Sequence, residues 1–114
     1  MKTGNFLKRL QIAFLGLVAA FKEEANFRLQ CVVAVAVVVL MIFFKLSAVE
    51  DSILILMILV VLSLELINSQ IEKFLDLIKP SHHPRVKIIK DFSAGAVLLS
   101  ALGSIVVGVL IFGK

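Results

Sequence analysis

Three long apolar runs dominate the chain, and charged or polar residues separate them. The run Phe92–Phe112 contains no charged residue and is long enough to cross a bilayer unaided. The run Leu29–Phe44 is shorter, and the basic residues at its two ends can extend their side chains to the membrane surface. Because about 20 apolar residues span the hydrocarbon core, the pattern predicts three transmembrane helices. We expect them at about residues 29–45, 52–78 and 88–112.

A further helix is predicted ahead of the first span, at about residues 3–24. Apolar residues between Phe6 and Phe21 recur every three or four positions, with Lys8 and Arg9 between them. This pattern is typical of an amphipathic helix that lies in the membrane interface. A cleaved signal peptide is the alternative, because the segment has a basic start followed by small apolar residues. We prefer the interfacial helix, which is expected to continue without a break into the polar run Lys22–Arg28.

The most unusual polar residues follow the second apolar run. Glu65, Asn68, Glu72 and Asp76 come after it with no turn residue in between, so one helix is expected to carry both segments. At about 100° per residue, the three carboxylates then lie roughly along one line, with the amide to one side. An unpaired carboxylate inside a membrane is costly. We therefore expect a cation against this row, and a metal ion with phosphate is the preferred hypothesis.

These charged residues also have purely structural interpretations. Glu65 could serve only to join neighbouring helices through a hydrogen bond. Glu24 could belong to a solvated cluster at the membrane surface, and Lys90 with Asp91 could form an ordinary interfacial charge pair. In the functional interpretation, Glu24 and Glu72 are oxygen ligands of Mg²⁺, which also holds phosphate. Lys90 then neutralises nucleotide phosphate.

Composition supports a membrane protein with one domain over residues 1–114. Of the residues, 61% are hydrophobic and only 18% are charged, and the mean hydropathy is +1.09. The net charge of +4 is spread along the chain without a DNA-binding motif, so we expect no nucleic-acid partner. Cys31 is the single cysteine, which excludes an intramolecular disulfide.

The basic residues predict the orientation of the chain. They gather before the first span and between the second and third, whereas the first loop is acidic overall. By the positive-inside rule, the N-terminus and the second loop are cytoplasmic and the C-terminus lies on the far side. Leu46–Ser52 is the expected outer loop and Ser81–Pro84 the expected inner turn, after Pro80 ends the preceding helix.

Taken together, three motifs resemble those of a known family. They are Glu24-Ala-Asn26-Phe-Arg28, Glu65-x-x-Asn68-x-x-Ile71-Glu72-x-x-x-Asp76 and Lys90-Asp91-x-x-Ala94-Gly95-Ala96-Val97. They are similar to those of the small prokaryotic lipid kinases, diacylglycerol kinase and undecaprenol kinase, over about Gly16 to Val97. The resemblance implies an all-α homotrimer in the bacterial inner membrane, with active sites shared between protomers. Its members move the γ-phosphate of MgATP to a lipid hydroxyl.

The resemblance also implies roles for individual residues. Glu65 is similar to the general base, which takes the hydroxyl proton and contacts the lipid together with Ala94. Glu24 and Glu72 match the magnesium-binding glutamates, and Asn68 and Asp76 match other polar residues of the site. The positions implied to contact ATP are Glu24, Glu72, Ser81, His82, His83, Lys90 and Asp91.

The chain also departs from the diacylglycerol kinase branch. Asn5 and Ile12 stand where that branch has an arginine and a tyrosine, and the nucleotide turn reads Pro-Ser-His-His-Pro. The Glu24–Arg28 and Ala94–Val97 segments look more like the undecaprenol kinase branch, which favours a polyprenol acceptor. Two other classes remain as alternatives. One is a proton- or cation-coupled transporter subunit, and the other is a structural membrane module.

Overall fold

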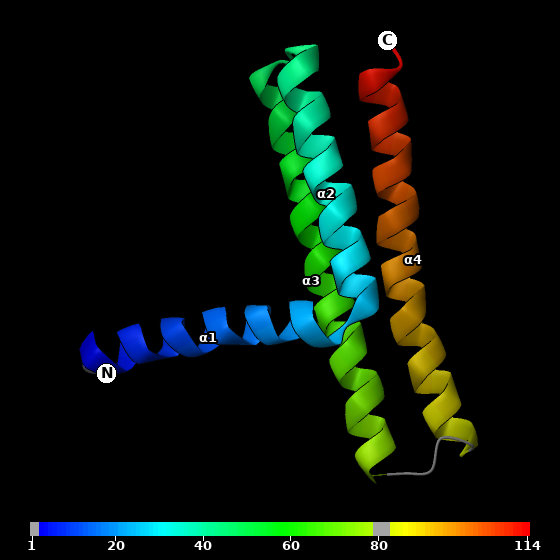
Figure 1. Ribbon diagram of the computed structural model, residues 1–114. Helices are drawn as coiled ribbons and strands as arrows, with labels where there is room; N and C mark the ends of the chain where they lie inside the picture. Colours follow the sequence, from blue (N-terminus) through cyan, green and yellow to red (C-terminus); the bar gives the residue numbers. More distant parts are fainter. Residues whose placement is uncertain (1–2, 79–82) are drawn as a thin grey trace.

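The computed structural model describes residues 3–78 and 83–114, and within these ranges the regular structure is entirely α-helical (Figure 1). The prediction of an all-α protein is therefore confirmed. Ser81 and His82, which the resemblance assigns to the nucleotide turn, lie outside the described residues. The four helices are α1 (Thr3–Glu23), α2 (Ala25–Phe44), α3 (Ala48–Ile78) and α4 (Pro84–Phe112).

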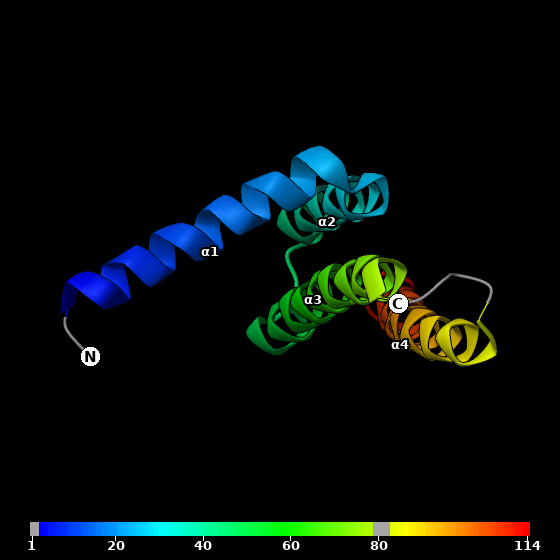
Figure 2. The same ribbon diagram turned by 90° about the horizontal axis from the view of Figure 1, so that it is seen from below.

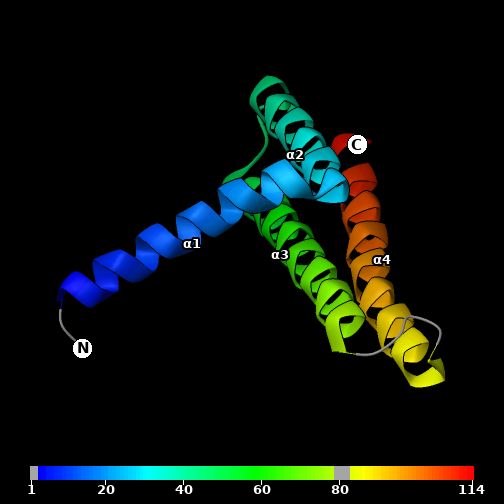
Figure 3. The same cartoon turned by 60° about the horizontal axis from the view of Figure 1, so that its bottom comes forward.

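Helix α1 extends sideways from the three long helices (Figures 1 and 3). It ends one residue before the predicted 24, because Glu24 has an extended backbone, with φ −108° and ψ 107°, and separates α1 from α2. Arg28 stabilises this corner, since its Nη1 donates to the carbonyl oxygens of Phe21 and Lys22, at 2.9 Å each. These carbonyls belong to the last turn of α1, where no helical N–H remains to pair with them.

Helices α2, α3 and α4 are each long and apolar enough to cross a membrane. Viewed from below, α3 contacts both of the others (Figure 2). Side chains on the α3–α4 seam pack closely near Gly103, where an added Cβ would lie 3.7 Å from Met57 Cε. Most large apolar side chains nevertheless remain exposed on the single chain. This is expected of helices whose outer faces meet lipid or further protomers.

The outer loop is shorter than the predicted Leu46–Ser52, because α3 already begins at Ala48. A capping box explains the early start. The backbone N–H of Glu50 donates to Ser47 Oγ at 3.2 Å, and the backbone N–H of Ser47 donates to Glu50 Oε1 at 3.1 Å. Glu50 also forms an ion pair with Lys114, which brings the C-terminus to this loop.

At the other end of the molecule, the predicted turn Ser81–Pro84 is wrong at its last residue, because Pro84 begins α4. His83 is the N-cap, and its Nδ1 accepts a hydrogen bond from the backbone N–H of Arg85 at 3.1 Å. Proline is well suited to the first position of a helix, because its fixed φ is helical and its missing N–H is not needed there. Helix α4 therefore starts four residues before the predicted 88.

Candidate active site

Glu65 is the most deeply buried charged residue that the structure describes, with 5% of its surface exposed. It lies within the continuous helix α3, as predicted, and it faces α2. There Gln30 Nε2 donates a hydrogen bond to Glu65 Oε1 at 3.0 Å. A buried carboxylate needs such a partner. Gln30 was not predicted, because nothing in the spacing of the sequence shows which helix face of α2 meets Glu65.

The polar row continues from Glu65 toward the end of α3. Asn68 is 8% exposed, and its Nδ2 donates to Glu72 Oε1 at 3.1 Å. Its Oδ1 is buried and has no hydrogen-bond partner among the described residues. Glu72 is half-buried, and the Asp76 side chain is 54% exposed. The row thus leads from a dry interior toward water, as the helical spacing predicted.

Glu24 reaches α3 within the same chain. Its carboxylate forms an ion pair with Lys73 and is only 17% exposed. Lys73 also lies 3.4 Å from Glu23 Oε1. Lys73 follows Glu72 directly in the sequence, so this ion pair brings Glu24 to the part of α3 that carries the polar row. Lys73 was missed in the sequence, because a lysine on a helix that enters water is most often a solvated surface residue.

Lys90 and Asp91 do not pair with each other, in contrast to the interpretation as one charge pair. Lys90 Nζ lies 2.6 Å from Asp76 Oδ1 and joins α4 to the end of the polar row. Asp91 is instead paired with Lys87, one turn earlier on α4, at 2.6 Å. Ala94 lies one turn after Lys90, and it is exposed on the surface of α4.

The acidic residues suit a magnesium ion that is held jointly with its substrate. Among residues 3–78 and 83–114, no three His, Cys, Asp or Glu side chains form a ready-made metal cage. Mg²⁺ does not need one, because it commonly takes one or two protein carboxylates and completes its shell with phosphate oxygens and water. Glu24 and Glu72 supply two such carboxylates. The unpaired Asn68 Oδ1 adds a neutral oxygen near Glu72.

An apolar groove of about 550 Å³ lies between α1, α2 and α3. Its walls include Phe27 and Cys31 of α2 and Leu62 and Leu66 of α3. Cys31 directly follows Gln30 and Leu66 directly follows Glu65 in the sequence, so the helix turns that carry the hydrogen-bonded pair also contribute walls to the groove.

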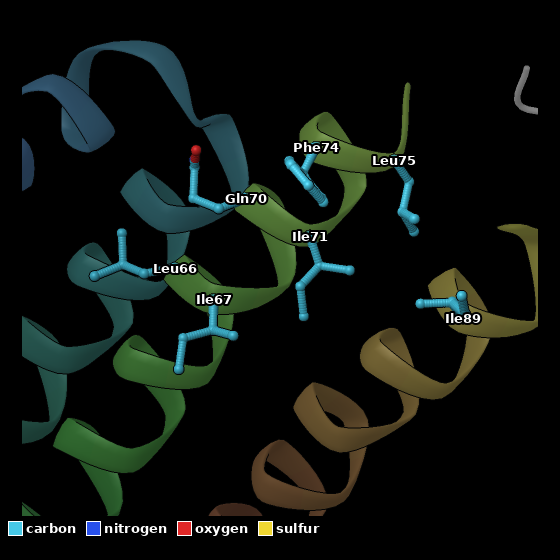
Figure 4. Close-up of a pocket in the computed structure, with 7 residues that line it drawn as sticks. All are labelled: Leu66, Ile67, Gln70, Ile71, Phe74, Leu75 and Ile89. Carbon is cyan, nitrogen blue, oxygen red and sulfur yellow. The ribbon is translucent and has the colours of Figure 1, made fainter. Parts of the chain in front are cut away.

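A second groove, of about 600 Å³, lies between α3 and α4. In Figure 4, Ile71 and Leu75 of α3 and Ile89 of α4 point into the space between the two helices. By helical spacing, Phe74 in its lining faces away from Glu65. Leu66, the residue after Glu65, lines both grooves.

Comparison with known proteins identifies the family. The sequence profile of the prokaryotic diacylglycerol kinase family matches residues 11–112. The chain is 39% identical over 108 residues to the undecaprenol kinase of Bacillus subtilis, covering 95% of this chain and 88% of that protein. It is 37% identical over 105 residues to a diacylglycerol kinase of Synechocystis, covering 91% of this chain and 60% of that protein.

A diacylglycerol kinase of Haemophilus influenzae is 32% identical over 110 residues, covering 95% of this chain and 93% of that protein. None of these similarities supports the alternative of a transporter subunit. The family implies that ATP is the phosphate donor and that a lipid alcohol is the acceptor. Together with the three apolar helices, these matches show that the chain belongs to the prokaryotic diacylglycerol kinase family and is a multi-pass membrane lipid kinase.

Proposed function

We propose that this lipid kinase phosphorylates undecaprenol in the bacterial inner membrane, with diacylglycerol as the second candidate acceptor. The observation that carries the proposal is the environment of Glu65. It is a buried carboxylate on a membrane-spanning helix, the residue that follows it lines an apolar groove, and it begins a polar row that ends at the exposed Asp76. Such a path lets a lipid alcohol meet an aqueous nucleotide. The Glu24–Arg28 and Ala94–Val97 segments favour the polyprenol.

In this proposal Glu65 is the general base. Its carboxylate takes the proton of the lipid hydroxyl while the hydroxyl oxygen forms a bond to the γ-phosphorus of ATP. The bond from that phosphorus to the oxygen it shares with the β-phosphate breaks, and ADP leaves with its electron pair. The proton on Glu65 then passes to water along the polar row. Ala94 contacts the lipid at the surface of α4.

The polar residues described above are proposed to hold the nucleotide. Glu24 and Glu72 would bind Mg²⁺, which supplies positive charge to the phosphates when it is bound. Asn68 and Asp76 complete the polar surroundings. Lys90 is already held toward this row by its ion pair with Asp76. The residues proposed to contact ATP, besides the two glutamates, are Ser81, His82, His83, Lys90 and Asp91.

We further propose a homotrimer with shared active sites and a cytoplasmic N-terminus. The exposed apolar faces of α2, α3 and α4 support self-association, because each could pack against a further copy. The basic residues near α1 and at the start of α4 support the orientation, because such residues favour the cytoplasmic side.

The test is phosphate transfer by the purified protein in mixed micelles. Undecaprenol, diacylglycerol and monoacylglycerol are each supplied with magnesium and labelled ATP, and the label in the organic phase is measured. We expect the highest kcat/KM with undecaprenol, and a preference for diacylglycerol would contradict the polyprenol assignment.

Glu65→Gln tests the proposed base in the same assay. It should lower kcat about 10²- to 10⁴-fold, the contribution of a general base, while the assembled protein elutes unchanged in size. Normal turnover by this variant would remove Glu65 from the mechanism.

A further inference from the structure

Gln30 is the only amide side chain in the apolar run of α2, from Leu29 to Phe44. A polar group inside a membrane helix is unfavourable unless it finds a partner. The partner of Gln30 is Glu65, 35 positions away in the sequence, with a 3.0 Å distance from Nε2 to Oε1. The bond therefore joins two helices at the carboxylate that is proposed to take the proton.

A hydrogen bond from an amide suits a general base better than an ion pair with a cation would. An amide donates a hydrogen bond but carries no charge, so it holds the carboxylate without neutralising it. A lysine or arginine at the same place would favour the ionised form much more strongly and weaken the carboxylate as a proton acceptor. Because Gln30 donates to Oε1, Oε2 is the oxygen proposed to meet the hydroxyl proton.

The surroundings of Glu65 explain why its carboxylate needs to be held. Glu65 shares a face of α3 with Asn68 and Glu72, which are hydrogen-bonded to each other, and a glutamate side chain has several rotatable bonds. Phe27 and Cys31, close to Gln30 in the sequence, line the apolar groove together with Leu66, the residue after Glu65. The amide thus holds the carboxylate on helix turns that also contribute walls to the groove.

We infer that Gln30 is a positioning residue, which fixes the Glu65 carboxylate in the orientation that accepts the proton of the lipid hydroxyl. The inference rests on the proposed role of Glu65 as the base. Gln30 itself exchanges no proton and touches no phosphate in this scheme. Its effect is on geometry, and small errors in the geometry of a reacting group are enough to slow an enzyme about 10²-fold.

The test compares Gln30→Met with Gln70→Met. Methionine has nearly the length and volume of glutamine but no N–H group. Gln70 is the matched control, because it lies on α3 and its Nε2 donates to Ser69 Oγ rather than to Glu65. We expect Gln30→Met to lower kcat about 10²-fold, with KM for ATP and lipid nearly unchanged, because the interaction matters in the transition state. Gln70→Met should keep the kcat of the unmodified enzyme.

Two further measurements, thermal unfolding and the activity of a double variant, show whether Gln30 positions the Glu65 carboxylate or only holds α2 and α3 together. If Gln30 acts through Glu65, adding Gln30→Met to Glu65→Gln should cause no further loss of the residual transfer. If the losses multiply, or if kcat falls only in proportion to the folded fraction, Gln30 holds the helices together and the inference is wrong. Gln30→Leu is analysed in the same way if Gln30→Met does not yield assembled enzyme.

The possible failures are distinguishable. An inactive Glu65→Gln together with a fully active Gln30→Met would leave the base in place and reject the positioning role alone. A fully active Glu65→Gln would reject the base, and the positioning role would fail with it.

Discussion

At the scale of single residues, the site is a set of contacts between charged or amide groups on different helices. Helical spacing correctly predicted that Glu65, Asn68 and Glu72 share a face of α3, because that relation is local. It could not predict Gln30 or Lys73, because their contacts depend on how α2 and the end of α1 pack against α3. The same reason explains why Lys90 was assigned to Asp91 although it contacts Asp76.

The ion pair between Lys90 and Asp76 leads to a prediction about nucleotide binding. Lys90→Ala should raise KM for ATP about tenfold or more, because a hydrogen bond to a charged phosphate contributes about 1.5–3 kcal/mol. Steady-state transfer measured against ATP concentration checks this. Arg85→Ala is the control, since Arg85 is a nearby exposed basic residue on the same helix. An equal rise in both variants would mean that Lys90 contributes only general positive charge.

At the scale of helices, the chain follows its hydrophobic pattern closely, and the differences lie at helix ends. All four expected helices are present. The observed starts differ from the predicted ones where a side chain caps a helix: Ser47 with Glu50 at α3, and His83 at α4. Caps depend on one or two residues, so a pattern averaged over many positions does not locate them.

The capping box predicts a stability effect that is separate from catalysis. Ser47→Ala should lower the free energy of unfolding by about 0.5–2 kcal/mol, because an N–H at the start of α3 loses its acceptor. Transfer by the folded enzyme should not change, since the outer loop is at the end of the molecule opposite the nucleotide residues. Ser52→Ala is the control, because its hydroxyl bonds within the helix to Ala48 O. Thermal unfolding of the two variants, side by side with the transfer assay, measures both effects.

At the scale of the whole molecule, three antiparallel helices and a crosswise helix divide the protein into two ends (Figures 1 and 2). One end is closed by the Phe44 and Phe112 rings, whose centroids are 5.1 Å apart, and by the pair of Glu50 with Lys114. The other end carries Asp76, Lys90 and His83. Sequence reasoning gave this arrangement in outline, because the length and order of the apolar runs determine it.

The two ends should therefore label from opposite sides of the membrane. In a Cys31→Ala background, Lys114→Cys should react with a maleimide that cannot cross the inner membrane, and Lys87→Cys should react only after the cells are opened. Both native lysines are exposed, so accessibility to solvent is comparable. The reverse labelling would mean that the N-terminus is outside.

The size of the groove between α1, α2 and α3 has a consequence for how the enzyme would meet a polyprenol. A space of about 550 Å³ would hold the hydroxyl end of the alcohol and its first isoprene units, whereas the remaining tail would stay dissolved among the acyl chains of the bilayer. The kinase would then never extract its alcohol from the membrane. Substrate arrival and product departure become lateral diffusion in two dimensions, and shortening the tail should change turnover far less than altering the first isoprene units.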